Sequence, residues 1–140
     1  MIDTSYDLLK DVYLLLDDGD RFFLKQYGIT PAQYYALLWL DVDEPKNLSQ
    51  LSKDMLTDPG NVTRLTDRMD ERGWVLRQRD QVDRRVIWVS LTPQGRQLCS
   101  KVRQAHADYV QVRMNLLTTE EQNQLQTLLH KLRDGLSKKP

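Results

Sequence analysis

The stretch DPGNVTRLTDRMDERG, residues 58–73, decides the fold, because both of its ends carry signals that bound a helix. Asp58 is suited to the N-cap, where its carboxylate accepts hydrogen bonds from unpaired backbone N–H groups, and Pro59 is suited to the first helical position. Gly73 stands where a left-handed C-cap ends a helix. Between these ends an apolar stripe recurs at helical spacing, formed by Val62, Leu65 and Met69. The opposite face offers guanidinium, hydroxyl and amide groups to a partner.

Two β-prone segments follow this helix. Residues 74–79 and 85–91 are rich in Val, Ile and Trp, and the polar, charged residues 80–85 join them. They predict a two-stranded hairpin with a basic tip. A helix followed by a basic hairpin, and preceded by another short helix, is the order of a winged helix-turn-helix. In that fold the helix enters the DNA major groove and the hairpin tip reaches an adjacent minor groove.

Further capping signals predict the flanking helices. One helix is expected over residues 4–28, starting near Ser5, and another after Thr30 and Pro31. A short helix after Asn47 precedes the residue 58–73 helix, and two more are expected within residues 93–136. The predicted class is therefore mainly α with a small β-hairpin, in a single domain over residues 1–140. Residues 30–92 are expected to form the winged helix-turn-helix lobe, with 4–28 and 93–136 as N- and C-terminal dimerisation helices.

The first helix has an apolar face wider than one small core requires. Such a face favours packing against a second subunit, as in long amphipathic helices generally. A core helix of a monomer is the alternative.

Charge is distributed unevenly in a chain whose net charge is zero. Residues 1–59 hold five Lys and Arg against eleven Asp and Glu, whereas residues 60–103 hold ten against five. Phosphate binding needs a local basic surface and not a basic protein, so the predicted helix and hairpin lie in the segment suited to DNA. A solvated charged face is the other interpretation of this segment.

Composition excludes several other classes. The sequence lacks a long apolar run or a signal segment, so we expect a cytoplasmic protein without a membrane partner. One cysteine, Cys99, rules out an internal disulfide, and with two histidines it leaves no ligand set for a metal. The chain also lacks a Gly-rich phosphate loop and a nucleophile motif, so we expect no catalytic residues, no enzyme activity and no cofactor.

The sequence resembles the MarR (multiple antibiotic resistance regulator) family of transcriptional regulators. The resemblance is carried by VTRL at residues 62–65, RGWV at 72–75, DRR at 83–85 and LTPQG at 91–95, and the elements along nearly the whole chain come in that family's order. It implies a homodimer, built from the first helix and the last two, that binds a pseudo-palindromic double-stranded DNA operator and regulates transcription, as a repressor released by a ligand.

Candidate DNA contacts lie on the residue 58–73 helix and on the hairpin. Arg pairs in bidentate fashion with guanine and Asn with adenine, Thr touches the thymine methyl group, and a glycine at a helix start lets a phosphate approach. The predicted contacts are Gly60, Asn61, Thr63, Arg64, Arg68, Arg77, Asp83, Arg84 and Arg85, with Arg72 and Arg79 as further phosphate contacts. A solvated face paired with acidic neighbours is the alternative for the helix arginines.

The resemblance also assigns roles at the hairpin tip. Arg85 matches the family's wing arginine, which is associated with the minor groove, and Asp83 matches the acidic residue that holds it. A guanidinium already fixed by a carboxylate costs less to order on binding. A turn-stabilising pair without a DNA role is the alternative.

Family members respond to a small aromatic or phenolic effector or to oxidation. The residues that could line an effector crevice are Tyr13, Tyr34, Tyr35 and Trp39, although aromatics at helical spacing also serve as core. Cys99 does not match the family's best-known sensing cysteine, near the N-terminus, and a buried inert thiol is the alternative to a redox role. A winged helix that binds protein and not DNA remains the competing function.

Overall fold

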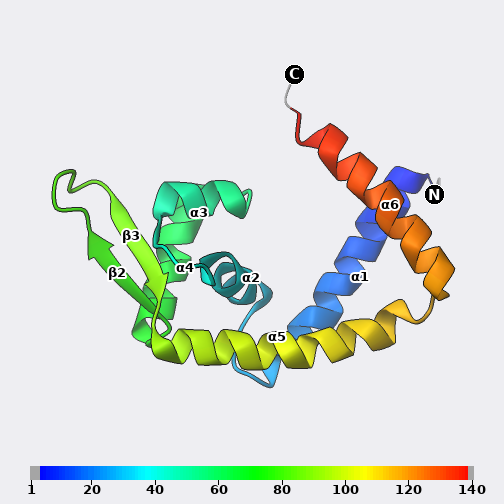
Figure 1. Cartoon of the computed structure of the whole chain (residues 1–140), viewed down its shortest axis with the longest axis horizontal. Coiled ribbons are helices and arrows are strands. Elements are labelled where there is room, and N and C mark those ends of the chain that lie inside the picture. The colour runs from blue at the N-terminus through cyan, green and yellow to red at the C-terminus, as the bar shows by residue number, and fades with distance from the viewer. Residues whose placement is uncertain (1–3, 139–140) are drawn as a thin grey trace. The chain divides into compact units, whose positions relative to one another are not determined.

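The computed structural model describes residues 4–138, which form a mainly helical chain with one small antiparallel sheet (Figure 1). In chain order the elements are α1 (Ser5–Lys25), α2 (Pro31–Leu40), β1 (Lys46–Asn47), α3 (Leu48–Asp54), α4 (Pro59–Glu71), β2 (Val75–Arg79), β3 (Ile87–Leu91), α5 (Pro93–Met114) and α6 (Thr119–Leu136). The predicted fold class is confirmed. No helix within residues 4–138 is long and apolar enough to cross a membrane.

The chain divides into two compact units. The first covers residues 1–103 and contains α1 to β3 with the first part of α5. The second covers residues 104–140 and contains the rest of α5 with α6. The predicted lobe, residues 30–92, lies entirely within the first unit.

Side-chain caps set the starts of α2 and α3. The Thr30 hydroxyl accepts the backbone N–H of Gln33 at 3.1 Å, and the Gln33 side chain accepts the N–H of Thr30 at 3.0 Å. Asn47 and Gln50 exchange the same pair of bonds at 2.8 and 2.9 Å. Each capping box satisfies two N–H groups that a helix start leaves unpaired. Both starts fall where the sequence predicted them.

The helix α1 begins as predicted but ends early. Thr4 caps it by accepting the N–H of Asp7 at 3.2 Å. Its last helical residue is Lys25, and Gly28 instead occupies the following turn with φ +71°. The predicted end at Gly28 was therefore three residues too late.

The sheet contains a strand that the sequence did not predict. The two residues of β1 pair antiparallel with β3, with Lys46 opposite Val89 and Asn47 opposite Trp88. β2 pairs with the other edge of β3, so the strand order is β1-β3-β2, and the β2–β3 hairpin projects from the helices (Figure 1). A two-residue strand is too short to show the alternation that predicts a strand.

One face of α4 is buried in the core of the first unit. Val62, Thr66 and Met69 are completely buried, whereas the predicted stripe residue Leu65 is only partly covered. The buried hydroxyl of Thr66 is satisfied because it donates to the carbonyl of Val62 at 2.9 Å. The core around this face also contains Leu24, Leu37, Leu40, Leu51, Val75, Val89 and Val102. Each such side chain contributes about 1.5–3 kcal/mol by leaving water.

The turn between α3 and α4 is strained. Leu56 has φ +53°, the left-handed conformation that glycine adopts more readily, and its side chain is almost fully exposed. This conformation allows the tight turn that leads into α4. Asp58 then caps α4, because its carboxylate accepts the N–H of Asn61 at 2.8 Å.

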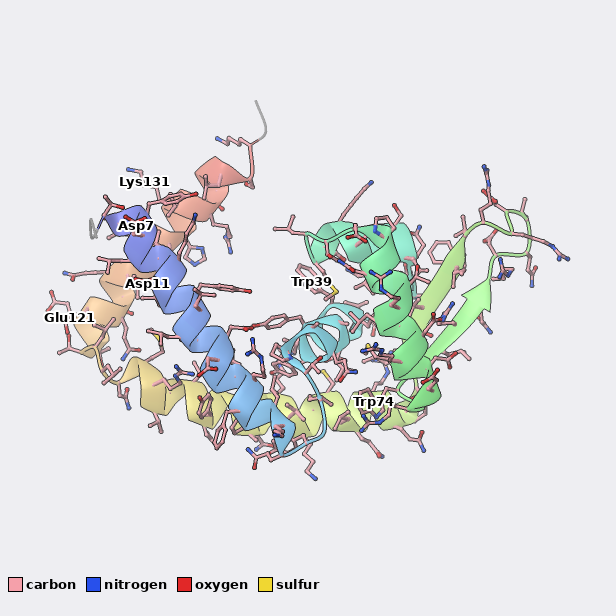
Figure 2. All side chains as sticks on the ribbon, turned by 180° about the vertical axis from the view of Figure 1, so that it is seen from behind. Asp7, Asp11, Trp39, Trp74, Glu121 and Lys131 are labelled. Atoms are coloured by element: carbon pink, nitrogen blue, oxygen red, sulfur yellow. The ribbon has the colours of Figure 1, made fainter. Side chains whose placement is uncertain are left out.

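The start of α5 approaches the backbone at the end of α4. Thr92 accepts the N–H of Gly95 at 3.0 Å and its own N–H donates to the carbonyl of Trp74 at 3.0 Å. A Cβ at Gly95 would lie 2.0 Å from that carbonyl oxygen. Figure 2 shows Trp74 where α4 gives way to the sheet, beside α5. Only glycine therefore fits at position 95.

The second unit has no buried core along α6. Thr118 and Glu121 form a capping box at its start, as predicted, with bonds of 2.9 and 3.2 Å. None of its residues is buried, and its exposed apolar side chains are Leu128, Leu129, Leu132 and Leu136. The apolar face of α1 is similarly exposed, at Leu8, Leu9, Val12, Tyr13, Leu15 and Leu16.

We predict that Gly95→Ala destabilises the protein by about 2–3 kcal/mol, because the new methyl group meets a carbonyl that is held by a hydrogen bond. Gly135→Ala is the control, since a Cβ there meets nothing within 4 Å. Because alanine favours the helix over glycine, this control should be neutral or gain about 1 kcal/mol. Urea unfolding followed by circular dichroism measures both, and equal stability of the two variants would contradict the close approach.

Candidate nucleic-acid interface

The exposed face of α4 lies opposite its buried face and carries two arginines. Arg64 and Arg68 are both exposed, one helical turn apart. They share this face because the core holds Val62, Thr66 and Met69 on the other side. The predicted base-contacting arginines are thus presented to solvent from a fixed helix.

Asn61 is tied into a network at the start of α4. Its amide nitrogen donates to Asp58 at 2.9 Å and to the Thr57 hydroxyl at 3.1 Å. Its amide oxygen accepts a short hydrogen bond from Arg64. Asn61 therefore positions Arg64, and its own donor is already used within the protein.

Two other predicted contacts in α4 differ in what they offer. The Thr63 hydroxyl donates to the carbonyl of Pro59 at 2.9 Å, which leaves its methyl group and an oxygen lone pair for a partner. Gly60 lies in the first turn, where an added Cβ would come within 3.2 Å of the Asp58 carboxylate and 3.6 Å of the Arg64 guanidinium. The glycine keeps this end of the helix open.

The structure pairs Arg77 with α4. Its side chain is one-fifth exposed, its guanidinium forms an ion pair with Asp67 of α4, and its buried Nε has no hydrogen-bond partner. The pair links β2 to α4. Arg77 is therefore paired with Asp67 within the lobe, and its predicted contact with a flanking phosphate stays a prediction. No local pattern signals this pairing, since the partners belong to different elements.

Arg72 is also engaged within the protein. It donates to the carbonyl of Gly28 at 3.1 Å and stacks on Trp74, with its guanidinium carbon 4.2 Å from the ring centre. It thereby connects the end of α4 to the turn after α1. Arg72 therefore has a structural role, and its predicted phosphate contact stays a prediction.

At the hairpin tip the structure brings Asp83 and Arg85 together as predicted. The Asp83 carboxylate accepts from Nε of Arg85 at 3.0 Å and from its Nη2 at 3.1 Å, which is a bidentate pair. These bonds lower the pKa of Asp83 below its ordinary value. The Arg85 side chain is nevertheless 91% exposed, so its outer edge is available to a partner. Arg84 is also exposed, and Arg79 donates to its carbonyl at 2.7 Å.

Asp80, which sequence reasoning missed, organises this tip. One carboxylate oxygen accepts the N–H groups of Val82 and Asp83 at 3.0 and 2.8 Å, and the other accepts the Trp88 indole N–H at 2.9 Å. These hydrogen bonds lower the pKa of Asp80, with the largest effect from the Asp83 N–H, the next from the Trp88 indole and the smallest from the Val82 N–H. An Asp at the start of a turn commonly accepts the backbone N–H two residues on, and this local signal would have identified Asp80.

A hollow of about 490 Å³ lies between α1, α2 and α4 in the first unit. Two of the four predicted effector residues, Tyr13 and Tyr35, line it, and so do Arg64 and Arg68. The other two lie elsewhere. Tyr34 is buried in the core, and Trp39 is exposed on α2 with the Lys46 ammonium 5.0 Å from its ring centre (Figure 2).

Burial distinguishes Cys99 from a reactive thiol. It is completely buried, and that burial raises the pKa of its thiol, so little thiolate exists at neutral pH. This placement favours the inert thiol over the redox sensor. Within residues 4–138, no three His, Cys, Asp or Glu side chains gather as metal ligands.

Comparison with known proteins agrees with this geometry. The MarR family profile matches residues 29–87, from just before α2 to the start of β3. The uncharacterized HTH-type transcriptional regulator YsmB of Bacillus subtilis (strain 168) is 30% identical over 131 residues, covering 94% of this chain and 90% of its own. YkoM, another uncharacterized HTH-type transcriptional regulator of that strain, is 31% identical over 107 residues, covering 76% and 70%.

The chain belongs to the MarR family. It is therefore a transcriptional regulator, and its family is one of regulators and not of enzymes. Among solved MarR structures, a mutant MarR from Escherichia coli complexed with operator DNA is 30% identical and superposes with a TM-score of 0.81. The alignment covers 90% of this chain and 91% of that MarR chain.

We predict that the wing of this MarR protein keeps its internal hydrogen bonds from neutral pH down to about pH 5. Because folding lowers the pKa values of Asp80 and Asp83 below 3.8, their stabilising contribution is present above that pH and is lost only as the pH falls further. The indole ¹H–¹⁵N resonance of Trp88 reports this directly. A shift of that resonance between pH 8 and 5 would contradict the expectation, and Asp80→Asn supplies the reference for the broken bond.

Proposed function

We propose that this protein binds a pseudo-palindromic double-stranded DNA operator as a homodimer and represses transcription until a small aromatic effector releases it. In each subunit α4 enters the major groove, and the tip of the β2–β3 hairpin enters the adjacent minor groove. The observation that carries this proposal is the face of α4: one side is buried in the core, and the other presents Arg64 and Arg68 to solvent. The proposed place of action is the cytoplasm.

Arg64 is the proposed base-reading residue. The hydrogen bond that Arg64 donates to the amide oxygen of Asn61 orders its side chain, so less conformational entropy is lost when the guanidinium pairs with guanine. Arg68, one turn further along, and the N–H groups at the start of α4 around Gly60 are proposed to bind phosphates. The methyl group of Thr63 is suited to a thymine. Asn61 acts mainly through Arg64.

The wing is proposed to add a second contact through Arg85. Its bidentate pair with Asp83 holds the guanidinium while leaving it 91% exposed. A guanidinium held this way is suited to a narrow minor groove, whose potential is strongly negative. Arg84, exposed beside it, is proposed to bind the flanking phosphate.

We propose the homodimer because α1 and α6 leave apolar side chains exposed to solvent. Both α1 and α6 expose a series of large apolar side chains, and contiguous apolar surface of this kind commonly marks a protein–protein interface. A twofold dimer would place its two copies of α4 about one DNA turn apart, roughly 34–36 Å, and so match a pseudo-palindrome.

The hollow lined by Tyr13 and Tyr35 is the proposed effector site. Aromatic walls suit an aromatic or phenolic ligand, and the guanidiniums of Arg64 and Arg68 at the same hollow suit an anionic group on it. A ligand that engages these guanidiniums withdraws them from DNA, which gives a direct route to release.

We predict that Arg64→Ala weakens binding to the preferred operator by about 10- to 100-fold, because a bidentate base contact contributes about 1–3 kcal/mol. The operator is first selected from a randomised duplex pool, and affinity is then measured by fluorescence anisotropy at two salt concentrations. Arg68→Ala should instead weaken binding to all sequences alike and reduce the salt slope by about one.

Lys101→Ala is the matched control for lost charge, since Lys101 is an exposed cation on α5 whose ammonium lies 5.9 Å from the ring centre of Tyr27 and which belongs to neither α4 nor the wing. It should leave operator affinity nearly unchanged. Failure of the wild-type protein to bind any duplex, at low salt and as an intact dimer, would reject the proposal in favour of a protein-binding winged helix.

We predict that 4-hydroxybenzoate at millimolar concentration releases the operator and that Tyr35→Ala raises the concentration needed by about tenfold, equivalent to about 1.4 kcal/mol of lost binding. Tyr34→Phe is the control, because Tyr34 lies in the core and not at the hollow. Equal release of wild type and Tyr35→Ala would place the effector elsewhere.

A further inference from the structure

The wing tip carries one almost fully exposed apolar side chain. Val82 is 95% exposed, between Asp80 and Asp83 in the turn that joins β2 to β3. A single exposed valine is ordinary on a protein surface. This one differs because the turn beneath it is held by hydrogen bonds on both sides.

Asp80 fixes the backbone of Val82. Its carboxylate accepts the N–H of Val82 at 3.0 Å and that of Asp83 at 2.8 Å, and its backbone N–H donates to the carbonyl of Val86 at 2.8 Å. The indole of Trp88 occupies the other carboxylate oxygen at 2.9 Å. Both carboxylate oxygens of Asp80 thus accept hydrogen bonds from wing residues, and the bond from Trp88 ties the turn to β3.

Asp83 fixes the other side of the tip. It accepts the backbone N–H of Arg85 at 3.1 Å besides the two guanidinium bonds, and its carbonyl accepts the N–H of Val86 at 3.0 Å. The tip therefore presents two exposed groups from a hydrogen-bonded turn: the isopropyl group of Val82 and the guanidinium of Arg85. Because valine is branched at Cβ, its side chain is also stiff.

The floor of the minor groove distinguishes base pairs by one group. A·T pairs show only acceptors there, whereas G·C pairs add the guanine N2 amino donor. An isopropyl group has no acceptor, so seating it over G·C removes water from that donor and replaces it with nothing. Over A·T the guanidinium of Arg85 supplies donors to the exposed acceptors. Val82 thus disfavours G·C and Arg85 favours A·T, so both side chains select the same base pair.

We propose that Val82 is a specificity-determining residue that selects A·T over G·C at the base pairs flanking each half-site, and that Asp80 is its positioning residue. This inference rests on the proposed function, since the wing must reach a minor groove.

The test compares three duplexes built on the selected operator. They differ only at the flanking pairs protected by the wing in a hydroxyl-radical footprint, which are A·T, G·C or inosine·C. Inosine lacks the N2 amino group, so inosine·C resembles A·T in the minor groove and G·C in the major groove. Wild type should bind the A·T and inosine·C duplexes alike and the G·C duplex about tenfold more weakly.

Val82→Thr is the matched variant, because it keeps the branched shape and adds a hydroxyl that can accept from N2. It should bind the G·C and inosine·C duplexes equally. Wild-type affinity that is the same for G·C and inosine·C flanks overturns the inference while leaving DNA binding intact. Binding to no duplex at all would overturn the proposed function as well.

Asp80→Asn tests the positioning role, since the amide retains the size of the side chain but weakens the bonds that hold the turn. The ratio of affinities for inosine·C and G·C duplexes should fall toward one, and the Trp88 indole resonance should shift. An unchanged ratio, with all three affinities lowered equally, would show that Asp80 only stabilises the fold and would overturn its assigned role.

Discussion

Burial of the Val62, Thr66 and Met69 face of α4 is the constraint on which the rest of the first unit depends. A helix has only two broad faces, so burying one determines what the other presents. Here the opposite face presents Arg64 and Arg68. The Thr66 hydroxyl can lie in that core only because the helix backbone accepts its hydrogen. Orientation of the cationic face is thus a consequence of packing and not of any contact made by the arginines.

Carboxylates within or just before the basic segment, residues 60–103, hold its guanidiniums in place. Asp58 acts on Arg64 through Asn61, Asp83 binds Arg85 directly, and Asp67 pairs with Arg77. Surface ion pairs contribute little to stability, so these pairs matter more for geometry than for free energy. Residues 60–103 hold ten cations against five acids, and three of those acids, Asp67, Asp80 and Asp83, organise the helix–wing structure.

The hollow beside α4, the proposed effector site, is lined in part by the same cationic face. Tyr13 comes from α1 and Tyr35 from α2, yet Arg64 and Arg68 close the hollow from α4. Arg72 further links the end of α4 to the turn after α1 through the carbonyl of Gly28. The end of α4 is therefore tied to the turn after α1 by a direct hydrogen bond, and the proposed effector would meet the side chains proposed to bind DNA.

The sequence by itself determined the helix starts, the order of elements and the Asp83–Arg85 pair. A cap such as Thr30 with Gln33, or a bidentate pair two residues apart, is complete within four residues and needs no distant partner. Gly73 likewise takes its left-handed φ, +77°, at the predicted helix end.

Only the tertiary structure decided the roles that depend on distant partners. It added β1 by pairing it with β3, engaged Arg77 with Asp67, and separated Tyr35 at the hollow from Tyr34 in the core. The requirement for glycine at position 95 arises from a carbonyl 21 residues away, that of Trp74. Such roles follow from which surfaces meet after folding, and spacing along the chain carries no record of them.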